Sequence, residues 1–242
     1  MKIYAIVNQK GGTAKSTTAA ILAQAAASKG KKVLCIDLDP QTNLSLALGA
    51  DTSQKGSYEV ITGAATADEV TQSNGNIDII AASWNLASLK TTSGSATRLQ
   101  DALKTTKKKY DLVFIDTPPT IGEQQYNALM AATAVIIPLE ADIYNLQSLY
   151  QLANTIKQFQ QSNKALKNSY FILTKFDNRS TLTRQMQQTI TVKANALDIK
   201  FLGCVRTAIA VKEAATLQQS IYEYAPKSKP AQDYLEILEQ LI

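Results

Sequence analysis

Histidine is absent from this sequence, and cysteine occurs only twice, as Cys35 and Cys204. Without histidine the chain cannot use imidazole as a general acid or base, and zinc loses one of its commonest ligands. The two cysteines lie far apart in apolar segments, and neither belongs to a CxxC pair. We therefore expect no disulfide framework or zinc site, and we expect both thiols to be buried structural groups.

Long hydrophobic runs are also lacking. Residues 1–7 are followed by the polar Asn8, which leaves too few apolar residues for a secretory signal. No later run, including residues 131–139, approaches the roughly 20 residues that cross a bilayer. We therefore expect a cytoplasmic protein.

Length and charge limit the possibilities further. The chain has 242 residues, of which 45% are hydrophobic, and this fits one α/β domain over residues 1–242. A formal net charge of +5 and a pI near 9.0 favour a polyanionic partner such as DNA. Many basic proteins have no such partner, so charge alone does not decide the question.

Short apolar runs alternate with longer amphipathic stretches along the chain. The runs, which predict strands, are residues 3–7, 33–36, 77–81, 112–115, 135–138, 170–173 and 201–205. The stretches, which predict helices, are residues 17–28, 96–106, 145–159, 182–194 and 230–242. Continuous apolar runs are typical of strands that helices cover on both faces. The predicted fold class is α/β, with a doubly wound, mostly parallel sheet and helices on both faces.

The first predicted strand leads into a glycine-containing loop, residues 8–17, and then directly into a helix. This is the context of a phosphate-binding loop, because glycines let successive backbone N–H groups converge on phosphate oxygens beside the helix N-terminus. The expected nucleotide contacts within this loop are Gly11, Gly12, Thr13, Ala14, Lys15, Ser16 and Thr17. We expect Lys15 to reach the β- and γ-phosphates and the Ser16 hydroxyl to bind Mg²⁺.

The loop departs from the common pattern GxxxxGK[ST], because Gln9 and Ala14 stand where its two glycines belong. It matches the deviant form KGGxxK[ST] instead, and the sequence resembles the ATPase family that carries this form and includes ParA, MinD and the nitrogenase iron protein. The resemblance implies a P-loop NTPase that binds ATP or ADP with Mg²⁺. It also implies that Lys10 is catalytic together with Lys15, and that Lys10 crosses a dimer interface to touch the other subunit's phosphates.

Two further segments place acids at the ends of apolar strands. Asp37 and Asp39 are two residues apart, so their carboxylates point the same way, and Pro40 ends the strand. This segment resembles the family's DxDPQ, which implies that Asp39 orients or activates the attacking water and that Asp37 supports the water shell of Mg²⁺. Asp116 follows strand 112–115 as a Walker B acid does, and would hold Mg²⁺ through water.

Downstream segments resemble the ParA/Soj branch in the same order. They are residues 127–140, 172–179, 205–214 and 224–228. Because the sequence begins at its first predicted strand, it is similar to the short ParA proteins that lack an N-terminal helix-turn-helix domain. The resemblance implies an ATPase with weak intrinsic activity that partitions plasmids or chromosomes. It also implies an ATP-dependent homodimer that binds nonspecific double-stranded DNA on the nucleoid and is released when a ParB-like centromere-binding partner stimulates hydrolysis.

Adenine and DNA contacts are also implied by the resemblance. The family's adenine contacts come from the loop after the late strand, here Arg206 and Ala208, where many relatives carry Pro and Asn; Arg206 facing DNA is the alternative. DNA would be held through its phosphates by Lys and Arg, with affinity falling as salt rises. The candidates lie in the C-terminal half and are Arg179, Arg184, Lys193, Lys212, Lys227 and Lys229.

Other functions on this fold stay open at this point. A MinD-like positioning ATPase needs a basic amphipathic C-terminal helix, but residues 230–242 carry Asp233, Glu236 and Glu239 and no Lys or Arg, so we expect no membrane partner. An iron–sulfur carrier needs thiolate ligands that two strand cysteines do not supply. A metabolic ATP-dependent ligase would not need Lys10, and a nucleotide-dependent binding switch would show negligible turnover.

Overall fold

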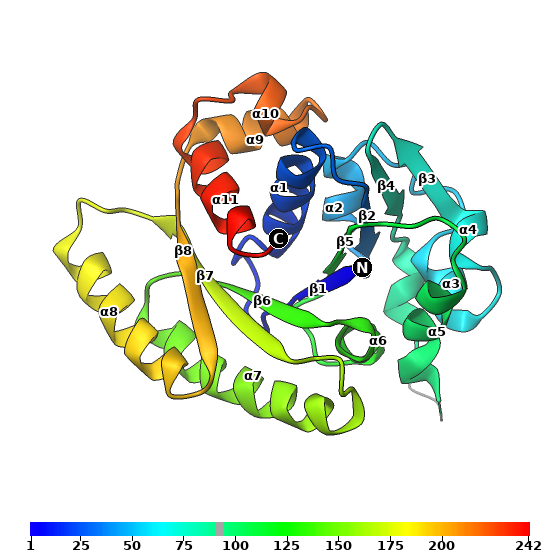
Figure 1. Ribbon diagram of the computed structural model, residues 1–242, viewed down its shortest axis with the longest axis horizontal. Helices are drawn as coiled ribbons and strands as arrows, with labels where there is room; N and C mark the ends of the chain where they lie inside the picture. The colour runs from blue at the N-terminus through cyan, green and yellow to red at the C-terminus, as the bar shows by residue number, and fades with distance from the viewer. Residues whose placement is uncertain (91–93) are drawn as a thin grey trace.

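The computed structural model describes residues 1–90 and 94–242, and its centre is an eight-stranded sheet in the order β3-β4-β2-β5-β1-β6-β7-β8 (Figure 1). The strands are β1 (Lys2–Ile6), β2 (Val33–Asp37), β3 (Thr71–Asn74), β4 (Ile77–Ile80), β5 (Leu112–Asp116), β6 (Ala134–Leu139), β7 (Asn168–Phe176) and β8 (Ile199–Arg206). Neighbouring strands are parallel, except that β3 pairs antiparallel with β4.

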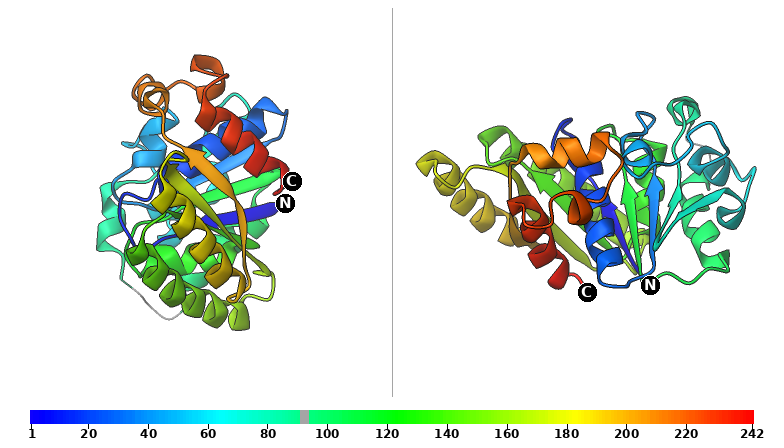
Figure 2. Two further views of the ribbon diagram at one scale, coloured as in Figure 1. Left: turned by 90° about the vertical axis from the view of Figure 1, so that its left-hand side faces the viewer. Right: turned by 90° about the horizontal axis from the view of Figure 1, so that it is seen from above.

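Helices cover both faces of the sheet (Figures 1 and 2). One layer contains α1 (Lys15–Ser28), α2 (Asn43–Ala47), α9 (Ile209–Thr216), α10 (Ile221–Tyr224) and α11 (Lys229–Glu239). The other contains α3 (Ser57–Thr62), α4 (Ala67–Val70), α5 (Arg98–Thr105), α6 (Glu123–Ala131), α7 (Ile143–Ser162) and α8 (Thr181–Asn195). Two short 3₁₀ helices, η1 (Trp84–Ser88) and η2 (Ser95–Thr97), precede α5.

Successive residues of the central strands serve the two layers in turn. In β1, Tyr4 and Ile6 pack into the core under α1 and α11, while Ile3 and Ala5 pack into the core on the opposite face. Since both sets of side chains are buried, the strand reads as a continuous apolar run. The predicted doubly wound, mostly parallel fold is confirmed.

The predicted strands and long helices are all present, but several elements carry too weak a pattern to be predicted. The edge strand β3 has the polar sequence TQSN, with residues that are half-buried or exposed. Most residues of α6 are buried around its whole circumference, so the helix shows little periodicity. The expectation that both thiols are buried is correct for Cys35, whereas Cys204 is half-buried.

The C-terminal helix packs as predicted. Tyr234, Ile237 and Leu238 of α11 are buried in the same core as α1. The chain end also reaches back to the first strand, since the Tyr4 hydroxyl donates a hydrogen bond to the Leu241 carbonyl at 2.6 Å. Within the described residues, no helix combines the length and hydropathy that a bilayer span would need.

The sheet brings three predicted functional segments to one edge. β1 lies next to β5, and β5 lies next to β2, with Ile6 and Asp37 both in register with Asp116. Because these strands are parallel, the segments that follow them emerge together on the side away from the two termini (Figure 2). The segments are the glycine loop after β1, the Asp39 turn after β2 and the Asp116 segment after β5.

Candidate nucleotide-binding site

A cavity of about 540 Å³ opens beside the glycine loop at this edge. Its walls come from the loop and α1, from the turn after β2, from the end of β7, and from α9 and α10. The predicted residues among its lining are Gly11, Gly12, Ala14, Lys15, Ser16, Thr17 and Asp39. The cavity therefore unites the phosphate loop with the acid that the resemblance places at the attacking water.

The glycine loop is held in place by contacts to neighbouring strand ends. Asn8 donates from Nδ2 to the Pro138 carbonyl of β6 at 2.7 Å, and its Oδ1 accepts from the Lys10 N–H at 2.9 Å. Thr174 of β7 donates from its hydroxyl to the Thr13 carbonyl at 3.2 Å. These contacts fix the loop against β6 and β7 and occupy the Thr13 carbonyl.

Ala14 takes a conformation that favours glycine. Its φ of 66° lies in the left-handed region, where a Cβ is disfavoured, and it immediately precedes α1. Gly12 also has a positive φ, of 76°. The loop thus keeps the curled backbone of a phosphate-binding loop although its second glycine is replaced, and the strain at Ala14 is of the kind found at functional sites.

Lys15 is the cation at the base of the loop. Lys15 is 7% exposed. Burial lowers the pKa of its ammonium, while the nearby carboxylates of Asp116 and Asp39 act to raise this pKa. A triphosphate would add negative charge beside a cation that the protein has largely removed from water. The position therefore suits the predicted contact with the β- and γ-phosphates.

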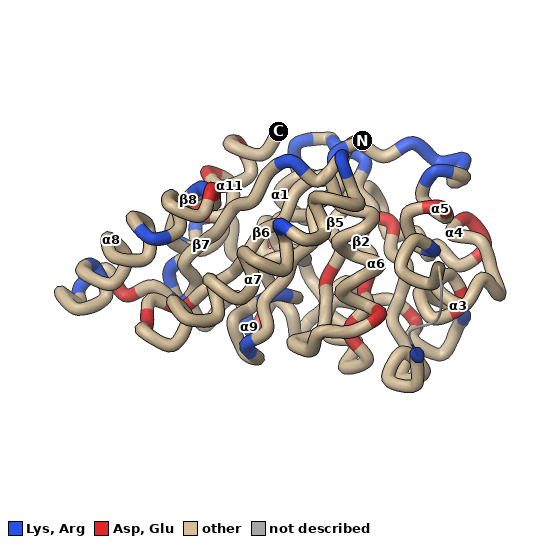
Figure 3. Tube along the Cα trace, turned by 90° about the horizontal axis from the view of Figure 1, so that it is seen from below, with Lys and Arg blue, Asp and Glu red and all other residues tan. Residues whose placement is uncertain are grey.

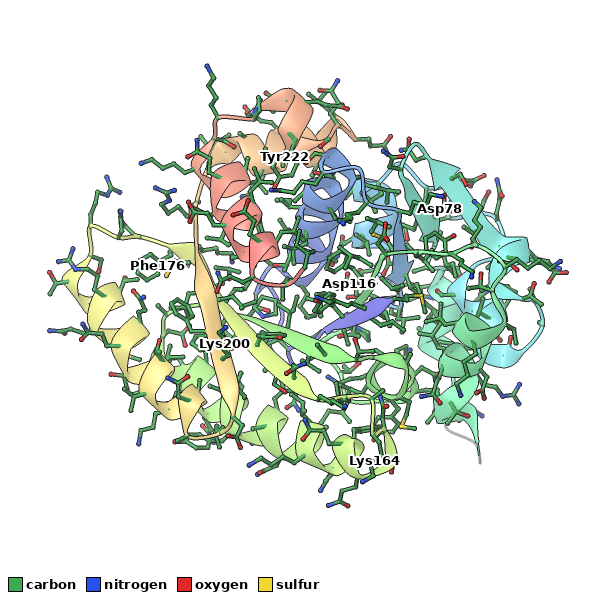
Figure 4. All side chains as sticks on the ribbon, viewed as in Figure 1. Asp78, Asp116, Lys164, Phe176, Lys200 and Tyr222 are labelled. Carbon is green, nitrogen blue, oxygen red and sulfur yellow. The ribbon has the colours of Figure 1, made fainter. Side chains whose placement is uncertain are left out.

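Asp116 is fully buried near the centre of the fold (Figure 4). Its Oδ1 accepts from the Thr117 N–H at 3.0 Å, while Oδ2 has no hydrogen-bond partner among the described residues. Burial raises its pKa well above the ordinary value, as does the charge of Asp37, whereas Ser16 and Lys15 lower it. The Asp116 Oδ2 is thus a buried acceptor without a partner, and the Ser16 hydroxyl lies near this carboxylate. Such an arrangement suits the water shell of a divalent cation.

Asp37 and Asp39 are linked by a hydrogen bond. Asp37 is fully buried, and its Oδ1 accepts from the Asp39 N–H at 3.0 Å. Its Oδ2 accepts from both the N–H and the hydroxyl of Ser45, at 2.9 and 2.7 Å. Burial raises the Asp37 pKa to about 6, although these hydrogen bonds oppose the shift. In this structure Asp37 fixes the turn that carries Asp39; its predicted role in the Mg²⁺ water shell stays a prediction.

The residues present fit Mg²⁺ only together with a nucleotide. Among the described residues there is no group of three or more Asp, Glu, His or Cys side chains that could hold an ion alone. Mg²⁺ favours oxygen ligands and often keeps several waters while binding one or two protein groups and substrate phosphates. Ser16 and Asp116 supply such groups, so they would hold the ion against the bound triphosphate.

Lys10 does not line the cavity. Its ammonium forms an ion pair with Asp142, the residue that caps α7, with 2.9 Å between Nζ and Oδ2. Both side chains are about one-third exposed, at 38% and 33%. Burial acts to raise the Asp142 pKa, but hydrogen bonds from Lys10 and from the Asn145 N–H outweigh it, so the pKa is lowered. The Lys10 ammonium thus lies at Asp142 and outside the cavity.

Lys175, at the end of β7, belongs to the site although the sequence analysis did not select it. It lines the cavity, and its Nζ donates to the Gly12 carbonyl at 2.8 Å and to Glu140 at 2.7 Å. The signal available in the sequence was a lysine at the end of a predicted strand. That signal becomes informative only when β7 is known to lie two strands from β1.

Arg206 and Ala208 are not among the residues that line the cavity. Instead the Arg206 guanidinium binds Asp233 of α11, with Nε at 3.1 and 3.0 Å from the two carboxylate oxygens. The far end of the cavity is lined by Ile21 and Gln24 of α1 and by Val211, Ala214, Gln219 and Ile221. The predicted adenine contacts stay a prediction, and the alternative that Arg206 faces DNA requires it to leave Asp233.

The six predicted DNA contacts lie on two separate parts of the surface. Arg179, Arg184 and Lys193 belong to α8 and the turn before it, while Lys212, Lys227 and Lys229 belong to α9 and the segment that leads into α11. Arg179 forms an ion pair with Asp177 at 3.1 Å, and Arg184 donates to the Asn178 carbonyl at 2.8 Å. All six residues are exposed, and their role stays a prediction.

The curled loop before α1, the buried lysine at its base and the two buried strand-end acids define a P-loop nucleotide-binding protein. A family model described as an AAA domain matches residues 1–168. The chain is 33% identical to the sporulation initiation inhibitor protein Soj of Bacillus subtilis, over 99% of this chain and 98% of that protein. It is also 33% identical to the chromosome partitioning protein ParA of Caulobacter vibrioides, over 100% of this chain and 94% of that protein.

Solved structures of related proteins are similar to this chain over nearly its whole length. A putative plasmid partition protein from Borrelia burgdorferi bound to AMPPNP is similar with a TM-score of 0.83 and 26% identity, over 99% of this chain and 98% of that one. Cobyrinic acid a,c-diamide synthase from Mycobacterium smegmatis, with ADP and magnesium, has a TM-score of 0.84 and 28% identity, over 100% and 94% of the two chains. This chain belongs to the ParA/Soj family of partitioning ATPases. Because a synthase shares the fold, the fold alone does not define the reaction of this chain, which follows from the residues of its site.

Proposed function

We propose that this protein is a DNA-partitioning ATPase that dimerises around ATP and Mg²⁺, binds DNA without sequence preference, and is released on hydrolysis stimulated by a ParB-like partner. The observation that carries the proposal is the meeting of Lys15, Ser16 and Asp39 around one cavity while Lys10 lies outside it. A lysine of the phosphate loop that lies outside the cavity of its own chain is available for the phosphates that a second chain holds.

Each residue of the site has a distinct task in hydrolysis. The loop N–H groups and Lys15 bind the phosphates and offset the charge that develops on them in the transition state. Ser16 and Asp116 would hold Mg²⁺, which would supply further neutralisation of the phosphate charge. Asp39 lines the cavity at the turn after β2, where its carboxylate can orient the attacking water and accept its proton.

Exposed apolar residues support dimerisation through this edge of the sheet. Ile121 follows β5, Ile143 and Tyr144 follow β6, Leu182 follows β7 and Ile209 follows β8, so all five lie on the side of the cavity. Each is more than half exposed, and Tyr144 is 77% exposed. Several exposed apolar side chains around a charged site are typical of a surface that another protein covers. In a twofold dimer through this surface, Lys10 of each subunit would approach the phosphates of the other.

A MinD-like membrane function is less well supported. The apolar face of α11 is buried against α1 and β8, and Asp233 of the same helix holds Arg206. Releasing α11 to lie on a lipid surface would expose Tyr234 and Leu238, which are 1% and 0% exposed. The helix therefore serves the core rather than a membrane.

The proposal is tested by DNA binding under three nucleotide conditions. Labelled duplex DNA is titrated with the protein in ATP and Mg²⁺, in ADP and Mg²⁺, and without nucleotide, each over a salt series, and phosphate release is followed in parallel. We expect DNA binding with ATP only, affinity that falls steeply with salt, and slow phosphate release. Equal binding in all three conditions would contradict the switch, and binding without any phosphate release would favour a binding switch over an ATPase.

A further inference from the structure

A dense group of lysines lies at the amino end of the sheet, on the side opposite the cavity. They come from the connection between α1 and β2 and from the connection between α5 and β5, and we call them the lysine rim: Lys29, Lys31, Lys32, Lys107, Lys108 and Lys109. Figure 3 shows Lys and Arg residues along the edge that carries both termini, and further ones over α8 and at α9. The lysine rim is therefore one of several basic parts of the surface.

The two connections form one surface. The Asp111 N–H donates to the Lys32 carbonyl at 2.9 Å, and the Lys32 N–H donates to Oδ2 of Asp111 at the same distance. The strands that follow are neighbours, with Val33 in register with Leu112. Since adjacent strands lie about 4.8 Å apart, the two connections lie side by side at the amino end of the sheet.

Ion pairs neutralise only part of the positive charge of the rim. Lys29 pairs with Glu239, and Lys108 pairs with Asp78, each at 2.8 Å. Over residues 1–90 and 94–242, no ion pair involves the remaining members, which are Lys31, Lys32, Lys107 and Lys109. Asp111 and Asp68 also lie here, since their carboxylates accept from the Lys32 and Lys107 N–H groups, at 2.9 and 3.0 Å. Six lysines thus face four carboxylates, and the excess of positive charge would attract a polyanion.

The chemistry of the rim favours nucleic acid over lipid. A membrane-binding surface adds apolar side chains that enter the acyl region. The only large apolar side chain in the two connections is Tyr110, which is 8% exposed and donates a hydrogen bond to Asp78 at 2.7 Å. Duplex DNA, by contrast, needs only lysines, since it presents about one phosphate charge per 1.7 Å of its axis.

We propose that the lysine rim binds the phosphate backbone of double-stranded DNA. The inference rests on the proposed function and adds the surface through which the DNA is held, in place of the residues on α8, α9 and α11. In a dimer joined through the cavity side, the two rims face away from each other. Each dimer would then hold two separate DNA segments, and dimerisation would strengthen binding to long DNA because one rim alone binds weakly.

The test compares two variants that remove the same charge from different places. In the rim variant, Lys31, Lys32, Lys107 and Lys109 are replaced by Gln; in the control variant, Lys193, Lys212, Lys227 and Lys229 are replaced by Gln. Removing four positive charges lowers the formal net charge from +5 to +1 in both. DNA affinity is measured by fluorescence anisotropy with ATP and Mg²⁺ over a salt series, and ATP affinity is measured alongside to verify folding.

We expect the rim variant to bind DNA at least tenfold more weakly than the native protein at about 0.1 M salt. Its slope of log affinity against log salt should be smaller by roughly 3 to 4, at about 0.9 per lost phosphate contact. The control variant should lose much less. Native affinity in the rim variant, or equal losses in both variants, would overturn the rim assignment alone. Absence of ATP-dependent DNA binding by the native protein would overturn the proposed function as well. Binding of both proteins to anionic vesicles is measured as well. If the rim variant lost vesicle binding but kept native DNA affinity, the rim would be assigned to lipid and the inference would be overturned.

Discussion

The ammonium of Lys10 and the carboxylate of Asp142 lie 2.9 Å apart, although 132 positions separate the two residues in the sequence. The pair joins the phosphate loop to the start of α7, beside the exposed Ile143 and Tyr144. If Lys10 serves the phosphates of a second subunit, it must leave Asp142 when the dimer forms. In such a dimer Asp142 would compete with the partner's triphosphate for the same cation.

Replacing Lys10 by Ala should abolish ATP-dependent dimerisation. The side chain is outside the cavity of its own subunit, so ATP affinity of the monomer should change little. Light scattering with ATP reports the dimer, and titration with a fluorescent ATP analogue reports the monomer's affinity. ATP-induced dimers of the Lys10→Ala variant would refute the sandwich arrangement.

Replacing Asp142 by Asn should make dimerisation easier. The amide oxygen can still accept from the Asn145 N–H and cap α7, while the charge that holds Lys10 is removed. A partly exposed ion pair contributes about 0.2–1 kcal/mol, so the ATP concentration at half-maximal dimerisation should fall by up to about fivefold. Asp101→Asn, which breaks an exposed pair with Lys104, is the matched control and should leave this midpoint unchanged. A higher midpoint in Asp142→Asn would count against competition for Lys10.

Replacing Lys175 by Met should weaken nucleotide binding without unfolding the protein. The variant keeps most of the aliphatic stem but loses the hydrogen bond to the Gly12 carbonyl, which is charge-assisted and worth roughly 1.5–3 kcal/mol. Because the side chain is 53% exposed, we expect the lower end, about a tenfold higher Kd for ATP. Lys167→Met, at the amino end of the same strand, is the control. Native ATP affinity in Lys175→Met would remove this residue from the site.

The sequence was sufficient to predict features that depend on residues close together along the chain. The glycine loop, Asp39 and Asp116 each follow an apolar strand within a short motif, and all lie where the fold class requires. Lys175 and Asp142 could not be assigned in this way, because their roles depend on β6 and β7 following β1 in the sheet. For the same reason the partner of Arg206 could not be predicted. Asp233 lies on α11, which contacts β8 only through tertiary packing, and a local sequence motif does not indicate that contact.

Replacing Asp116 by Asn should stabilise the nucleotide-free protein at neutral pH. Asp37 and Asp116 are fully buried on adjacent strands, and the native pKa of each lies above its ordinary value of 3.8, at about 6 for Asp37. The folded state thus holds these protons more tightly than the unfolded state. The contribution of Asp37 is complete below about pH 3.8 and is lost as the pH rises through about 6, and the raised pKa of Asp116 acts in the same direction.

At pH 7.5 the substitution removes a buried carboxyl group whose ionised form is disfavoured by burial and by Asp37, which we expect to raise the free energy of unfolding by roughly 1–3 kcal/mol. For a chain of this size that is a rise in Tm of about 2–12 °C. The gain should shrink as the pH falls towards 3.8, because the carboxyl group is then protonated in the unfolded state as well. Thermal unfolding at pH 7.5 and pH 4.5 measures both values. A lower Tm at pH 7.5 would show that Asp116 stabilises the fold as a carboxylate.

Replacing Asp39 by Ala should trap the protein as a dimer on DNA. Asp39 lines the cavity, and its substitution removes the carboxylate that we assign to the attacking water while leaving Lys15 and Ser16 to bind ATP. Its Oδ1 also accepts from the Gln41 N–H at 3.0 Å, so Ala disturbs the turn as well as the chemistry. Asp39→Asn separates the two effects, because the amide keeps the acceptor but is not a base.

Both variants should dissociate from DNA at least 100-fold more slowly after ATP is added, given that general bases contribute about 10²–10⁴ in rate. Slow dissociation of Asp39→Ala combined with native dissociation of Asp39→Asn would assign the residue to the turn alone, and native dissociation of both would exclude it from catalysis.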